Sequence, residues 1–136
     1  MQIQSLAGWQ DHILAGRKYL ETAGKGLSRP AVFTNELIFQ LTALAIEKLI
    51  VGMCQYHRQM PLDHTLSGLV EGLAPVCRLD AELAARIKWI EQIDDMCALA
   101  PANRSAPSDV EIQEILDVGR QVAGFAEGYV PFLEPE

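Results

Sequence analysis

The segment from Glu36 to Arg58 constrains the fold more than any other part of the chain, because apolar residues cover almost the whole circumference of the helix that it predicts. A helix of this kind must be covered on more than one side. Only a thin polar stripe, through Gln40, Glu47, Gln55 and Arg58, interrupts the apolar surface. One bundle core cannot cover so much apolar surface, so we predict a two-fold homodimer with this helix or the last one at the interface.

Four further segments show helical spacing of their apolar residues, and none shows the strict alternation of a half-buried strand. Gly24-Lys25-Gly26 and Pro30 are expected to end the first helix, while Asp63, Asp80 and the Ser108–Glu111 pair are expected N-terminal caps. The predicted helices cover residues 3–22, 31–58, 64–73, 81–98 and 109–130. The predicted fold is therefore all-α, an up-and-down four-helix bundle with one additional short helix in a single domain.

The composition agrees with one domain that needs neither metal nor disulfide to fold. The chain has 136 residues, of which 49% are hydrophobic, and three cysteines with neither the number of a disulfide framework nor the spacing of a metal knuckle. We expect Cys54, Cys77 and Cys97 to be small core residues in a reducing compartment. No glutamate has a histidine three residues on, the spacing of di-metal bundles, so we predict no metal and no cofactor.

The net charge of -7 disfavours a general nucleic-acid coat, which must neutralise many phosphates, although it leaves room for a small basic patch. The first twenty residues contain charged side chains and no apolar signal core. Glu47-Lys48 interrupts the longest apolar run, so we expect no membrane span. The expected location is cytoplasmic.

The order of motifs in residues 31–73 resembles the HEPN family of small helical bundles. The signature of that family runs from an alanine-rich helix with Gln and Glu-Lys, through a Pro-containing loop, to His-x-Leu and a further Leu. The matching residues are Gln40, Ala45, Glu47, Lys48, Pro61, His64, Leu66 and Leu69. The resemblance implies a binding or accessory module that partners a nucleotidyltransferase or another protein in a toxin–antitoxin or defence system.

Arg58 and His64 raise the alternative of a metal-independent endoribonuclease. Many HEPN ribonucleases use an Arg and a His separated by four to six residues, and five intervene here. The His would act as general acid or base at the ribose hydroxyl, while the Arg would hold the phosphate. In that branch, however, the pair lies near the start of the last long helix, where residues 103–111 contain no His. We therefore prefer a helix-start role for His64 beside Asp63.

Two further interpretations stay open. Arg104 matches an Arg that precedes a Pro-containing loop in the related branch, which implies a phosphate or nucleotide contact together with free amides after the Ser108 cap. Asp109 and Glu111 in the same turn would repel a phosphate, so we expect only weak binding of nucleotide or RNA. The chain has no P-loop and no ordinary hydrolase motif, and a structural dimer without ligand is the remaining alternative.

Overall fold

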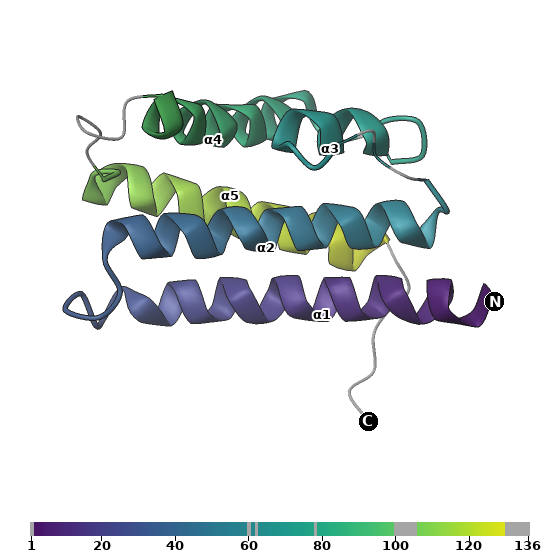
Figure 1. Ribbon diagram of the computed structural model, residues 1–136, viewed down its shortest axis with the longest axis horizontal. Coiled ribbons are helices and arrows are strands. Elements are labelled where there is room, and N and C mark those ends of the chain that lie inside the picture. The colour runs from purple at the N-terminus through teal and green to yellow at the C-terminus, as the bar shows by residue number, and fades with distance from the viewer. Residues whose placement is uncertain (1, 60, 62, 78, 100–105, 130–136) are drawn as a thin grey trace.

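The computed structural model describes residues 2–59, 61, 63–77, 79–99 and 106–129, with the side chains of residues 2–7, 94–99 and 129 outside that description. Within these ranges the chain forms five helices and no strand, so the predicted all-α class is confirmed. The helices are α1 (Gln2–Gly26), α2 (Asn35–Tyr56), α3 (Leu66–Leu73), α4 (Ala81–Leu99) and α5 (Asp109–Tyr129) (Figure 1).

The helices are arranged in layers, with α1 on one side, α2 and α5 in the middle, and α3 and α4 on the other side (Figure 1). The contacts agree with this arrangement, because α2 packs against α1, α3 and α5, while α4 packs against α3 and α5. The most extensive contact joins α1 and α2, which run in opposite directions. The apolar helix α2 therefore lies at the centre, as its sequence predicts.

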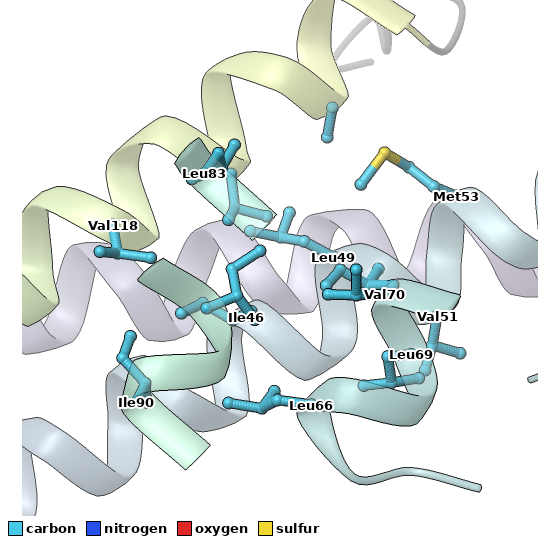
Figure 2. Close-up of a cluster of buried hydrophobic side chains, with 14 of the residues drawn as sticks. Ile46, Leu49, Val51, Met53, Leu66, Leu69, Val70, Leu83, Ile90 and Val118 are labelled. Carbon is cyan, nitrogen blue, oxygen red and sulfur yellow. The ribbon is translucent and has the colours of Figure 1, made fainter. Parts of the chain in front are cut away.

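The apolar surface of α2 is covered within the chain. Ile46, Leu49 and Met53 have no exposed surface, and Figure 2 shows them among apolar side chains of α3 and α4 such as Leu69 and Leu83. Within the described part of the chain, the exposed large apolar residues all lie outside α2. They are Leu14, Leu27, Val32 and Val110. The sequence predicted a dimer through α2 because part of its apolar surface was expected to stay uncovered. The described residues of α2 show no such exposed apolar surface.

Glycines allow α1 and α2 to approach each other closely. A Cβ atom on Gly16 would lie 2.7 Å from Cγ of Leu49 and 3.0 Å from the carbonyl oxygen of Ala45. A Cβ atom on Gly52 would lie 2.8 Å from Cδ1 of Ile13. These distances are at or below the closest approach of real Cβ atoms, so both positions need the absence of a side chain.

The predicted end of α1 is wrong. The helix continues through the Gly24-Lys25-Gly26 segment that was expected to break it. A Cβ atom on Gly26 would lie 2.6 Å from ring atoms of Phe33, so the following loop folds back against this glycine. Glycine has a low helix propensity, but the packing of Phe33 and of α2 against α1 outweighs that preference.

The predicted start of α3 is also displaced. Thr65, rather than Asp63, is the N-cap, and its hydroxyl accepts a hydrogen bond from the N–H of Gly68 at 3.0 Å. Asp63 instead accepts a hydrogen bond from the N–H of Thr65 at 3.0 Å. Hydrogen bonds from the side chain and backbone of Thr65 hold the pKa of Asp63 below its usual value. Asp63 therefore orders the turn before α3 and leaves the cap to its neighbour.

Two cysteines have the predicted core positions. Cys54 and Cys77 are buried and free, while the side chain of Cys97 lies outside the described residues. Burial, with a smaller contribution from nearby Cys77, raises the pKa of Cys54 to about 11. This thiol is therefore protonated and unreactive at neutral pH.

Among the described helices, only α2 is long and apolar enough to cross a membrane. The Glu47-Lys48 pair was expected to prevent this, but it does not lower the mean hydropathy of the helix enough. Most of its apolar window, 61%, is buried against the rest of the chain. Core helices of soluble proteins share this length and composition.

Candidate functional site

A pocket of about 310 Å³ lies between α2, the start of α3 and α4. We call it the α2–α3–α4 pocket. Its volume is at the small end of the range for ligand sites, enough for a side chain or a small organic group. Apolar side chains from all three elements form its walls: Phe39, Ala43, Leu44, Leu66 and Ile90.

A glutamate and a histidine meet at this pocket. Nδ1 of His64, in the turn before α3, lies 3.0 Å from Oε2 of Glu47 in the middle of α2. Glu47 is half-buried, whereas His64 is exposed. The contact orients the imidazole ring through Nδ1, and Nε2 has no hydrogen bond among those described for this ring. The sequence left the partner of Glu47 open, and the structure assigns His64 to it.

A second glutamate connects α3 to α4. The carboxylate of Glu91 in α4 accepts a hydrogen bond from the backbone N–H of Ser67, in the first turn of α3. The next amide, of Gly68, donates to the Thr65 hydroxyl. These acceptors satisfy amides that a helix start leaves free, and the carboxylate complements the positive end of the helix dipole. The start of α3 therefore has a fixed position relative to α4.

The charge of the pocket selects the ligands that it can hold. Its lining includes the two carboxylates of Glu47 and Glu91, together with Gln40 and His64, and it contains no Lys or Arg. A phosphate would be repelled there, in a chain whose net charge is already -7. A neutral or positively charged group on an apolar stem would find complementary surroundings.

The described residues give no metal centre, because no group of three or more His, Cys, Asp or Glu side chains is close enough to hold an ion. Glu47 and His64 alone supply two ligands, fewer than the three or four protein ligands of typical zinc sites.

Arg58 lies outside the α2–α3–α4 pocket. It follows the end of α2 with a positive φ of 60°, and its N–H donates to the carbonyl of Gln55 at 2.9 Å. The N–H of Gln59 donates to the carbonyl of Cys54 at 2.8 Å, which completes a Schellman motif. Glu47, which holds His64, lies earlier on the same helix, about 15 Å along its axis. The backbone of Arg58 thus ends α2, and the hydrogen bonds and ion pairs described above do not join Arg58 to His64.

The other predicted ligand contact involves Arg104 and Ser108. Arg104 lies outside the described residues. Ser108 forms the predicted capping box, because its hydroxyl accepts from the N–H of Glu111 at 3.1 Å and its own N–H donates to Oε1 of Glu111 at 2.9 Å. Asn35 of α2 donates to the carbonyl of Pro107 at 2.9 Å. The backbone N–H and the hydroxyl oxygen of Ser108 are therefore already engaged within the chain.

The sequence did not identify Glu91. In the sequence it is one more polar residue on an amphipathic helix, and its role appears only when α3 packs against α4. A Thr cap before a short helix indicates that further acceptors are needed at its first turn, but it does not reveal which distant residue supplies them.

Comparison with known protein families, with curated proteins and with solved structures finds no match to this chain. The resemblance to HEPN proteins thus rests on the residues quoted above, and the function must be argued from the pocket.

Proposed function

We propose that this chain is a HEPN-like binding module whose α2–α3–α4 pocket receives a basic side chain of a protein partner. The observation that carries the proposal is the lining of the pocket, in which Glu47 and Glu91 lie beside apolar walls with no Lys or Arg. The aliphatic stem of a lysine or arginine would pack against Phe39 and Leu44. Its charged head would then form charge-assisted hydrogen bonds with the carboxylates.

The residues that carry the family resemblance support this site. Gln40, Glu47, His64 and Leu66 come from two separate stretches of the sequence and all line the pocket. We extend the proposal to the partner class that the resemblance implies, a nucleotidyltransferase or another protein of a toxin–antitoxin or defence system, and to a cytoplasmic location.

A binding role agrees better with these residues than catalysis does. Glu47 and His64 form a carboxylate–imidazole pair that could accept a proton. The lining contains no Cys, Ser or Lys nucleophile and no Arg to hold a phosphate. The hydroxyl of Thr65, which also lines the pocket, already bonds to Asp63 and Gly68.

An NMR titration with n-butylguanidinium, which mimics an arginine side chain, tests the pocket directly. We expect saturating amide shifts at Gln40, Glu47, His64 and Glu91, with a dissociation constant on the order of millimolar. n-Butanol should bind more weakly, because it lacks the charge. Inorganic phosphate or butyrate that binds these residues more tightly than n-butylguanidinium would contradict the proposal.

Two variants test separately whether the volume of the pocket and its negative charge are needed for binding. Ala43→Phe should fill the pocket and abolish the shifts without a change of charge. Glu91→Gln keeps an acceptor for Ser67 and should weaken binding of n-butylguanidinium while binding of n-butanol stays unchanged. Equal losses for both probes would show that the carboxylate does not recognise the cation.

The partner class and the ribonuclease alternative have separate tests. If the neighbouring gene encodes a nucleotidyltransferase, its purified product should bind the wild-type chain and lose at least about tenfold in affinity for Ala43→Phe. RNA incubated with the wild type without metal should remain intact. Cleavage that disappears in both Arg58→Ala and His64→Ala would replace the binding proposal with the endoribonuclease.

A further inference from the structure

We infer that the α2–α3–α4 pocket selects the guanidinium group of arginine over the ammonium group of lysine. The inference rests on the proposed function, which leaves the kind of basic side chain open. It is carried by three side-chain oxygens that belong to lining residues and accept no hydrogen bond within the described part of the chain. They are Oε1 of Gln40, Oε1 of Glu47 and Oε2 of Glu91.

Each carboxylate is held in place through its other oxygen. Oε2 of Glu47 lies 3.0 Å from Nδ1 of His64. Oε1 of Glu91 accepts a hydrogen bond from the backbone N–H of Ser67. These contacts orient both carboxylates before a ligand enters, so a cation that bonds to the remaining oxygens does not have to order them.

The amide of Gln40 adds the third acceptor. Its Nε2 donates to Oε2 of Glu36, one turn earlier on α2, at 3.1 Å. The amide nitrogen is therefore engaged, and the amide oxygen remains for a ligand. A guanidinium group has five donors and no acceptor, so it can donate to all three oxygens at once.

The two carboxylates come from helices that are not direct neighbours. Among the described helices, α2 and α4 have no extensive contact with each other, and the pocket lies between them. A nitrogen that bonds to two oxygens must lie within about 3.2 Å of both. The donors of a guanidinium group are distributed over three nitrogens, whereas the donors of an ammonium group share one. Guanidinium can therefore bond to oxygens that are farther apart.

The apolar walls of the pocket favour the same group. Ala43, Leu44 and Ile90 line the pocket and would replace water around the head group of the ligand. An ammonium ion is more strongly hydrated than a guanidinium ion, so the loss of water costs lysine more. The ring of Phe39 is also part of the lining, and a planar guanidinium group stacks on aromatic rings.

NMR titrations of the full chain with n-butylguanidinium and n-butylammonium compare the two head groups on one stem. We expect the dissociation constant of n-butylammonium to be at least about tenfold higher. Equal constants would overturn the selectivity and leave the proposed binding of basic side chains intact. Failure of both probes to bind would overturn both proposals.

A methylated probe tests the role of the hydrogen bonds. N-butyl-N′,N″-dimethylguanidinium keeps the charge and the plane of the head group but has fewer donors. We expect it to bind at least about fivefold more weakly than n-butylguanidinium. Equally tight binding would show that the free oxygens do not select the ligand, and would overturn the inference.

Gln40→Met removes the third acceptor without a change of charge, at an exposed position of α2. It should weaken binding of n-butylguanidinium more than binding of n-butylammonium, and so lower the ratio of the two constants. Gln113→Met makes the same substitution at an exposed position of α5, outside the pocket, and should leave the ratio unchanged. Circular dichroism verifies that both variants are folded. A ratio that Gln40→Met leaves unchanged would overturn the inference.

Discussion

At the scale of the residue, Arg58 is held in a backbone conformation that favours glycine. Its φ of 60° lies in the left-handed region, which costs a non-glycine residue about 1–2 kcal/mol. The Schellman hydrogen bonds of Arg58 and Gln59 at the end of α2 require this conformation. The strain belongs to the helix terminus, and no contact of the Arg58 side chain is needed to explain it.

Arg58→Gly should therefore raise the free energy of unfolding by about 1 kcal/mol, because glycine adopts a positive φ without strain. Urea denaturation measures the change. Arg58→Ala, which removes the charge but keeps the strain, should have little effect. Gln113→Gly, on the exposed side of α5, should instead destabilise by about 1 kcal/mol. If Arg58→Ala stabilised as much as Arg58→Gly, the side chain rather than the backbone would be responsible.

Two helix caps that depend on near neighbours were predicted correctly and the cap expected of Asp63 was not, whereas roles that join distant segments could not be predicted. The Ser108–Glu111 capping box and the Asp80 cap involve residues at most three positions apart, and both are present. Glu91 bonds to Ser67, which lies 24 positions earlier, and no local pattern encodes such a contact.

At the scale of the element, apolar periodicity predicted five helices in the observed order, because each helix buries one face regardless of its neighbours. The end of α1 was missed because Phe33 packs against Gly26, which single-helix propensity does not include. The up-and-down four-helix arrangement and the family resemblance stay predictions.

The glycines of α1 and α5 should respond in opposite ways to alanine. Gly16→Ala should destabilise by about 1–3 kcal/mol, since the new methyl group would overlap Leu49 and approach the Ala45 carbonyl. Gly128→Ala, where a Cβ atom meets nothing within 4 Å, should be neutral or stabilise by up to about 1 kcal/mol. Thermal and urea unfolding measure both changes. Equal effects would mean that α1 and α2 are less closely packed than described.

At the scale of the whole molecule, two tryptophans report on opposite layers. Trp9 lies on α1 and Trp89 on α4, and both pack against the buried core. Because α2 and α5 connect these layers, the chain should unfold in one cooperative step, as single domains of this length usually do.

Trp9→Phe and Trp89→Phe each leave one tryptophan as a fluorescent probe of one layer. We expect each variant to give the same urea midpoint by fluorescence as by far-UV circular dichroism. Midpoints that differ between the two methods would show that α1 and α4 unfold separately, and would refute the single-domain prediction.

The α2–α3–α4 pocket contains no described residue of α1 or α5 in its lining. A homodimer that formed through the last helix, α5, one of the two interfaces predicted from the sequence, would therefore leave this pocket open and display it twice. A partner with two basic side chains at the matching separation would bind bivalently, and its second contact would form at a high effective concentration. Weak single-site affinity in the millimolar range would then be compatible with a long-lived complex.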